Sequence, residues 1–298
     1  MTVQLQDAAG ASHAVRELLE QLDVKEAREG VFFGASQDLG WGRVYGGQVL
    51  GQALAAAGRT VDPSRSAHSL HSYFLRPGDP RKPIEYQVEH TRDGRSFTTR
   101  RIRAEQHGKP IFFMAASFQI PEPGLEHQDT MPEVPGPDGL MSYTDLIHRH
   151  QEVLPESMSG WAMMDFPIEM RPVEVSNPMN PEPTDPVQYM WLRAASQLPS
   201  SPAVHKCVLA YAADFVLLDT ALLPHGTSYW QGTLRMASID HAMWFHRDFK
   251  MDDWLLYSMD SPSAAGARGL VRGQFYDRGG RLVASTVQEG LMRPVAKF

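Results

Sequence analysis

Three polar side chains interrupt apolar runs in the second half of the chain, and their types could do chemistry together. Asp214 lies between two alanines and Phe-Val-Leu-Leu, Ser238 precedes an aromatic run, and Gln288 ends a small, mostly apolar run. Burying an unpaired carboxylate is costly, so we expect Asp214 to have hydrogen-bond donors or a raised pKa. A carboxylate of raised basicity beside a hydroxyl and an amide could hold and deprotonate water. The residues alone equally allow a structural acid, a strand-end glutamine facing water and an ordinary strand-start serine.

The chain carries one pattern twice, at an offset of 170 to 171 residues. The matched pairs are His71 with His241, Phe74 with Trp244, Tyr86 with Tyr257, Arg101 with Arg272, and Gly108 with Gly279. A repeat of this length indicates a duplicated domain and not a solenoid unit. Polar residues present in one copy alone therefore mark the place of chemistry. By this alignment Gln48 stands near the position of Asp214, and Ala116 or Ser117 stands near that of Gln288.

Length and composition describe an ordinary globular protein. The chain has 298 residues, 42% hydrophobic and 21% charged, with a net charge of −7. This length predicts two cores or one fused pair, and the acidic balance without a basic block argues against a nucleic-acid partner. No run of 18 apolar residues exists and the N-terminus is polar, so we expect no membrane span or signal peptide.

A single cysteine, Cys207, rules out an intrachain disulfide and fits a reducing compartment. We therefore expect a cytoplasmic protein. The C-terminal Ala-Lys-Phe weakly resembles a peroxisomal address, which is the alternative.

Two similar sets of elements are predicted. An amphipathic helix over 12–28 and a strand at 31–34 precede a buried helix of small side chains over 46–57, and four strands follow, at 66–75, 84–92, 95–106 and 109–120. Proline-rich sequence from 121 to 202 includes a helix at 143–154 and a strand at 187–193. A second buried helix over 203–223 contains Asp214, and strands at 234–246, 254–262, 265–277 and 281–293 complete the second set.

The expected domains are an N-terminal unit at 12–120, a connector at 121–165, and a C-terminal unit at 166–298. Each unit is of the α+β class, with an antiparallel sheet wrapped around a long helix.

Four stretches carry a family resemblance. Residues 46–54 (Gly-Gly-Gln-Val-Leu-Gly-Gln-Ala-Leu), 68–79, 240–246 and 284–292 resemble acyl-CoA thioesterases II of the TesB type, in order and spacing. The resemblance covers the chain from about 12 to 293. It implies a double hotdog fold and the hydrolysis of acyl-CoA to free fatty acid and coenzyme A, without a metal or redox cofactor. It also implies a homo-oligomer, a dimer or tetramer.

The family uses an Asp, a Thr or Ser, and a Gln, which by position fall on Asp214, Ser238 and Gln288. This chain has serine where the family often has threonine, and both supply a hydroxyl. Asp214 would then act as general base to a water held by the other two side chains.

Further residues are expected to bind substrate. Backbone N–H groups of Gly46, Gly47 and Gln48, at a helix N-terminus, could stabilise the oxyanion. Arg268 and Arg272 could face the phosphates of coenzyme A, or could be solvated strand arginines.

Other kinds of site have less support. No Gly-x-Ser-x-Gly or His-Glu-x-x-His motif occurs. We interpret His68, His71, His241 and His246 as sheet histidines bonded to their neighbours, and Cys207 as an inert buried thiol. A hotdog hydratase or dehydratase, which would need a His paired with an acid, and a non-catalytic acyl-CoA binding module stay open as alternatives.

Overall fold

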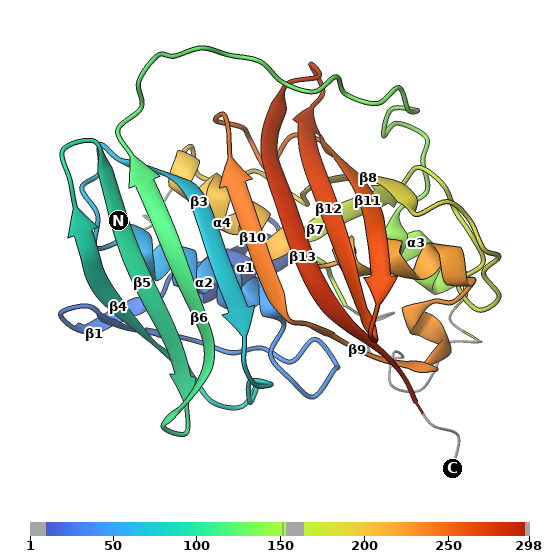
Figure 1. The fold of residues 1–298 in the computed structure, drawn as a ribbon, viewed down its shortest axis with the longest axis horizontal. Coiled ribbons are helices and arrows are strands. Elements are labelled where there is room, and N and C mark those ends of the chain that lie inside the picture. Colours follow the sequence, from blue (N-terminus) through green and yellow to red (C-terminus); the bar gives the residue numbers. More distant parts are fainter. Residues whose placement is uncertain (1–9, 151, 153–163, 296–298) are drawn as a thin grey trace.

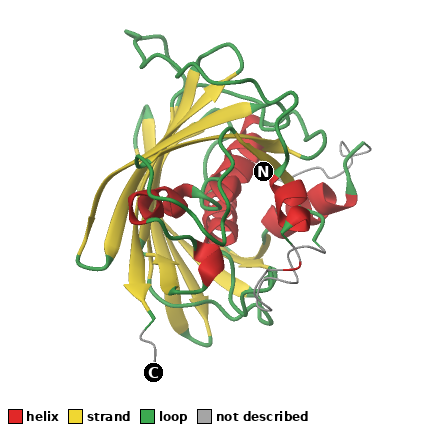
Figure 2. Ribbon diagram, turned by 90° about the vertical axis from the view of Figure 1, so that its right-hand side faces the viewer, coloured by secondary structure: helices red, strands yellow, loops and turns green. Residues whose placement is uncertain are grey.

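The computed structural model describes residues 10–150, 152 and 164–295. Within these ranges every strand belongs to one antiparallel sheet, which curves around the helices (Figures 1 and 2). Part of the predicted helix at 143–154 lies outside the described residues, and so does all of the C-terminal Ala-Lys-Phe.

The strand order across the sheet is β1-β2-β4-β5-β6-β3-β10-β13-β12-β11-β8-β7, with β9 pairing with β13. The first half contains β1 (Lys25–Arg28), β2 (Val31–Gly34), β3 (Ser66–Phe74), β4 (Ile84–Asp93), β5 (Phe97–Gln106) and β6 (Lys109–Gln119). The second contains β7 (Ile168–Pro172), β8 (Val187–Ala194), β9 (Leu234–Ser238), β10 (Asp240–Phe245), β11 (Leu255–Ala265), β12 (Arg268–Asp277) and β13 (Leu282–Pro294). The predicted helix over 12–28 is too long, because the first helix ends at Leu22 and residues 25–28 form β1. Strand β7 was not predicted, because it lies among prolines.

The helices are α1 (His13–Leu22), α2 (Gly46–Gly58), α3 (Tyr143–Arg149) and α4 (Pro202–Ala212), with 3₁₀ helices η4 (Leu217–His225) and η5 (Tyr229–Gln231). Helices α2 and α4 lie side by side in opposite directions, since Gly47 faces Tyr211 and Gly51 faces Cys207. A Cβ on Gly47 would lie 2.1 Å from the carbonyl oxygen of Tyr211, so the glycine is what lets the two backbones approach. The small side chains of α2 were correctly taken as the mark of a buried helix.

Strands β3 and β10 join the two halves. Their register places Ser72 opposite His241 and His71 opposite Ala242, and the Phe74 N–H donates to the Ile239 carbonyl oxygen at 2.9 Å. The largest hydrophobic cluster of the described residues extends through both halves, and two smaller clusters accompany it. The arrangement is the expected double hotdog, two helix-and-sheet units sharing one layer of helices.

The predicted repeat holds, with one correction to its register. Tyr86 matches Tyr257 and Arg101 matches Arg272 at an offset of 171, since each pair occupies the same place in its ladder. His71 does not match His241, because the side chain of His71 faces outward and that of His241 faces the core. Phe74 does not match Trp244 either: Phe74 pairs with Phe112 as Phe245 pairs with Ala284, so Phe245 is its counterpart. Leu70 is the counterpart of His241, because a one-residue shift in a strand exchanges the faces.

The predicted helix over 203–223 is wrong in its second part. Helix α4 ends at Ala212, and the chain turns before η4 begins at Leu217. Carbonyl groups at a helix end lack intrahelical donors, and here tyrosine hydroxyls bond two of them. Tyr45 Oη donates to the Tyr211 carbonyl at 2.9 Å, and Tyr257 Oη donates to that of Ala213 at 3.3 Å. The helix can therefore end inside the core.

The segment Pro202–His225 is long and apolar enough, with a mean hydropathy of 1.6, to pass a simple test for a membrane-spanning helix. Within its most apolar window 67% is buried in the fold. Its apolar composition is therefore accounted for by the protein core.

The connector after β6 runs along one rim of the sheet toward the second half (Figure 1). Side chains of the second half hold it: Trp191 Nε1 donates to the Pro135 carbonyl and an Arg171 Nη donates to that of Pro137, both at 2.8 Å. Residues 121–141 contain neither helix nor strand, as the prolines predicted. The domain boundaries given above stay a prediction.

Candidate active site

Three hydrogen bonds converge on the carboxylate of Asp214, in the turn after α4. Ser238 Oγ and Gln288 Nε2 each donate to Asp214 Oδ1 at 2.9 Å. The backbone N–H of Gly47, in the first turn of α2, donates to the same carboxylate. The three residues predicted from the sequence therefore meet at one oxygen atom, together with one of the predicted glycines.

A β-bulge turns Ser238 toward the core. Ser238 pairs with Gly290, and Ala242 pairs with Val287, so four residues along one strand match three along the other. The extra residue lies at Ile239, between β9 and β10, and places Ser238 on the same face as His241. Bulges commonly redirect a side chain in this way.

The amide orientation of Gln288 follows from its two neighbours. Its Nε2 donates to Asp214, so its Oε1 faces Nδ1 of His241 at 3.3 Å. The imidazole must then carry its proton on Nδ1, an assignment made from the hydrogen-bond network. Burial lowers the pKa of His241 to about 4, so the ring is neutral near pH 7. His241 was interpreted as a sheet histidine bonded to a neighbour. That neighbour is Gln288, one of the predicted site residues. The periodicity of the strand could not predict this contact, because the two residues are far apart in the sequence.

Glycines at the start of α2 form the other wall. A Cβ on Gly46 would lie 2.5 Å from Asp214 Oδ2, so any side chain there would displace the carboxylate. The positive end of the helix dipole also lies at this N-terminus. The site thus combines Asp214 of the second half with Gly46 and Gly47 of the first.

Burial and hydrogen bonding oppose each other at Asp214. Burial raises the pKa of its carboxyl group, the donors Ser238, Gln288 and Gly47 lower it, and the resulting value is about 6. The group is ionised at pH 7 and more basic than an exposed aspartate. This is the range in which a carboxylate can act as a general base.

A cavity of about 390 Å³ opens beside the carboxylate. Asp214, Ser238 and Gly46 line it, whereas Gln288, which is 1% exposed, does not. Its walls are mainly apolar and aromatic, formed by Trp41, Val49, Phe74, Ile111, Phe112, Phe215, Leu218 and Leu291, among others. This combination of an apolar cavity and a few polar groups is typical of a small-molecule site.

The other predicted binding residues lie elsewhere. Gln48 points away from the cavity, where its Nε2 donates to the Ala35 carbonyl at 2.9 Å and its Oε1 accepts from Gln21 at 2.9 Å. Arg268 pairs with Glu289 at 2.8 Å and Arg272 with Asp260 at 2.6 Å. Neither arginine lines the cavity, and both lie on the face of β12 opposite the helices, because Gly269 between them faces η4.

The remaining histidines and the cysteine have local contacts. His68 Nε2 lies 2.8 Å from Ser117 Oγ and His246 Nε2 lies 2.8 Å from Ser285 Oγ, as expected for sheet histidines. His71 contacts the Trp244 ring edge-on. Burial raises the pKa of Cys207 to about 12, which makes it an inert thiol near neutral pH.

The first half lacks the three polar groups. Arg100 pairs with Ala116 as Val271 pairs with Gln288, so Ala116 is the counterpart of Gln288. The same bulge recurs between Ala67 and Ser69, which makes Ala67 the counterpart of Ser238.

Thr60, two residues after α2, takes the place of Asp214, two residues after α4. The expected match of Asp214 with Gln48 is wrong, because Asp214 follows its helix whereas Gln48 lies in the first turn of α2.

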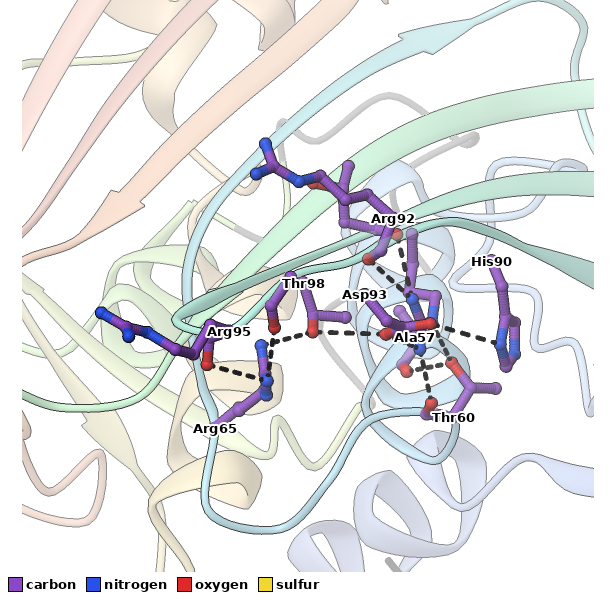
Figure 3. A network of polar contacts seen from close by, with 11 residues as sticks. Ala57, Thr60, Arg65, His90, Arg92, Asp93, Arg95 and Thr98 are labelled. Atoms are coloured by element: carbon purple, nitrogen blue, oxygen red, sulfur yellow. Dashed lines mark hydrogen bonds and ion pairs between the residues drawn. The ribbon is translucent and has the colours of Figure 1, made fainter.

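A buried arginine occupies this corner of the first half. Arg100 Nε donates to Thr60 Oγ1 at 2.9 Å, and an Nη donates to Asp93 Oδ1 at 2.7 Å. Figure 3 shows the surrounding network, in which Thr60 also bonds to the Ala57 carbonyl and Arg65 bonds to Thr98. A cation and its partners thus fill the position that a carboxylate occupies in the second half.

Comparisons with known proteins match both halves. Residues 158–291 match the family described as acyl-CoA thioesterase, and residues 36–119 match the acyl-CoA thioesterase N-terminal domain. The chain is 39% identical to acyl-CoA thioesterase 2 of Haemophilus influenzae over 282 residues, covering 95% of this chain and 99% of that protein. It is 43% identical to acyl-coenzyme A thioesterase 8 of Homo sapiens over 260 residues, covering 84% and 81%.

Among solved structures, the acyl-CoA thioesterase II TesB2 from Mycobacterium marinum superimposes with a TM-score of 0.77 at 39% identity. The match covers 94% of this chain and all of that one. The sequence match extends over both halves, and so does the structural one. The chain therefore belongs to the acyl-CoA thioesterase II (TesB-type) family and is a double-hotdog thioester hydrolase.

Proposed function

We propose that the chain hydrolyses acyl-CoA to free fatty acid and coenzyme A with Asp214 as the general base. The observation that carries this proposal is the convergence of Ser238 and Gln288 on one carboxylate oxygen beside an apolar cavity. The acyl chain occupies the cavity, and the thioester carbonyl lies near Asp214 and Ser238. The reaction belongs to fatty-acid and acyl-CoA metabolism, and the scheme uses neither a metal nor a redox cofactor.

The proposed roles follow from which atoms face the cavity. A water molecule binds beside Ser238 Oγ and donates to Asp214 Oδ2, the carboxylate oxygen to which neither Ser238 nor Gln288 donates. The carboxylate takes one proton as the water oxygen attacks the thioester carbon. Gln288 does not line the cavity, so its role is to hold the carboxylate through Nε2. The tetrahedral intermediate then expels the coenzyme A thiolate, which takes the proton held by Asp214 as it leaves, and the carboxylate is restored. We assign the oxyanion to the backbone N–H of Gly46, which lines the cavity at a helix N-terminus.

The experiment that tests the proposal follows release of free coenzyme A from palmitoyl-CoA with a thiol reagent, in wild type and in Asp214→Asn. The expected result is release by wild type and almost none by the variant. A loss of enoyl absorbance with an enoyl-CoA, without thiol release, would instead support a hydratase. Binding of palmitoyl-CoA without any turnover would support a binding module.

Further proposals concern how coenzyme A is bound, whether the chain forms an oligomer, and where the protein is located. Arg268 and Arg272 could bind the phosphates of coenzyme A only if the substrate displaced their present partners, Glu289 and Asp260. Arg76 lines the cavity and is therefore a better candidate for phosphate binding. A homo-oligomer and a cytoplasmic location remain proposals, to be tested by light scattering and by imaging the tagged protein.

A further inference from the structure

A second carboxylate, Asp219, is half-buried, lines the same cavity and has no role in the proposed mechanism. It lies in the first turn of η4, and no described group donates a hydrogen bond or an ion pair to its side chain. Burial raises its pKa to about 7. A half-buried carboxylate that has no donor in the protein keeps its hydrogen-bonding capacity for the cavity, so a donor that reaches it there would bind favourably.

Two tyrosine hydroxyls accompany Asp219. Tyr143 and Tyr229 line the same cavity as Asp219. Burial raises the pKa of both tyrosines, and the charge of Asp219 adds to this, whereas Arg43 lowers the pKa of Tyr229. Tyr143 Oη accepts a hydrogen bond from Trp230 Nε1 at 3.2 Å and donates to no described group. Tyr229 Oη has no hydrogen bond to any described residue. The cluster thus offers an acceptor and two donors, all with unused capacity.

The cluster stands where two cavities meet. A smaller cavity of about 120 Å³ adjoins the first, and Asp219, Tyr143 and Tyr229 line both. Asp214 and Ser238 line only the larger one. An acyl chain that starts at Asp214 and extends toward the smaller cavity would pass these three polar side chains.

We propose that Asp219, Tyr143 and Tyr229 form a subsite that binds a hydroxyl group on the acyl chain, so that hydroxylated acyl thioesters are the preferred substrates. A hydroxyl is the group that fits, because it donates one hydrogen bond, to Asp219, and accepts others, from the tyrosines. An ammonium group could donate to Asp219 but would leave the tyrosine donors unbonded. The proposal rests on the proposed function, since it places the acyl chain in this cavity.

The test compares decanoyl-CoA with a series of monohydroxydecanoyl-CoAs in which the hydroxyl moves along the chain. For wild type, one position of the hydroxyl is expected to raise kcat/KM about tenfold or more over decanoyl-CoA, the effect of a hydrogen bond to a charged group. Asp219→Leu is expected to remove that preference and to raise kcat/KM for decanoyl-CoA severalfold. Tyr229→Phe, which removes only a hydroxyl, is expected to reduce the preference in part.

Asp185→Asn is the matched control for Asp219→Asn, because Asp185 is an exposed acid that lines neither cavity. The control variant is expected to keep the preference for the hydroxylated substrate. If Asp219→Leu does not fold, Asp219→Asn and Tyr229→Phe decide the question. Equal kcat/KM for all hydroxyl positions, or a preference that survives both Asp219 variants, overturns the subsite. Absence of any thiol release from decanoyl-CoA in wild type would instead contradict the proposed function, so the two failures are distinguishable.

Discussion

At the scale of single residues, the site is defined by what surrounds one carboxylate. Burial alone would raise the pKa of Asp214 further. The donors from Ser238, Gln288 and Gly47 oppose this and hold the pKa at about 6. The two donors at Oδ1 also fix the carboxylate in one orientation, which leaves Oδ2 beside Gly46. A base that is both ionised and poorly solvated is suited to accept a proton from water.

Asp214→Asn is expected to lower kcat by about 10²–10⁴, the usual loss when a general base is removed. The amide occupies the same volume but cannot accept a proton from water. Release of coenzyme A measures the loss, and thermal melting shows whether the variant is folded. A folded variant that keeps more than roughly a tenth of wild-type kcat would exclude Asp214 as the base.

The pH dependence of kcat should show an acid limb near the pKa of Asp214, at about 6. Only the ionised carboxylate accepts a proton, so kcat falls as the pH drops below this value. Ser238→Ala and Gln288→Ala each remove a bond that stabilises the charged form, so the limb should move to higher pH in both. An acid limb at the same pH in both variants, or at lower pH, would contradict these contacts.

His241→Leu should lower kcat about tenfold, the effect of one lost hydrogen bond, with little change in KM. Without the Nδ1–H donor, the Gln288 amide is free to rotate and present its oxygen to Asp214, which would repel the carboxylate. His241→Asn can place an amide N–H near the Nδ1 position and should restore part of the loss. Equal losses in both variants would point to packing and not to orientation of the amide.

At the scale of elements, the sequence predicted the residues of the site better than the geometry that unites them. The strands around Ser238 and Gln288 were predicted because apolar alternation is a local signal. The bulge at Ile239 was not, because the extra residue is defined only by pairing with β13. The end of α4 was missed for a similar reason, since Tyr45 and Tyr257, which cap it, are distant in sequence. The resemblance to a family supplied the roles, and the fold supplied His241 and the bond from the predicted Gly47 to the carboxylate.

Helix α2 depends on glycine where it meets α4, and two substitutions in the same helix test this. Gly47→Ala puts a Cβ 2.1 Å from the Tyr211 carbonyl and should cost about 1–3 kcal/mol of stability. It should also lower kcat, because α4 leads directly to Asp214. The control is Gly58→Ala, where a Cβ meets nothing within 4 Å and alanine favours the helix. Similar melting temperatures for the two variants would contradict this, because they would show that α2 and α4 can move apart at Gly47 without loss of stability.

At the scale of the whole molecule, one core and one sheet make the two halves interdependent. Helices α2 and α4 cover each other, and β3 pairs with β10 along the join. A half expressed alone would expose these surfaces to water. One of the two outer edges is formed by β1, a short and fully exposed strand that reads Lys-Glu-Ala-Arg, and the other by β7. Short charged edge strands resist pairing, so the β1 edge is a poor candidate for the contact in a homo-oligomer.

One active site per chain is the expected consequence of the asymmetry between the halves. At the corner where the second half has Asp214, Ser238 and Gln288, the first has Thr60, Ala67 and Ala116, and the guanidinium of Arg100 bonds to Thr60. A water molecule there would meet no free base, because the carboxylate of Asp93 is paired with Arg100. Titration of the folded chain with a non-hydrolysable acyl-CoA analogue should therefore give one site, and residues 160–298 alone should be inactive because Gly46 and Gly47 belong to the other half. Two equivalent sites, or full activity from that fragment, would contradict a site built from both halves.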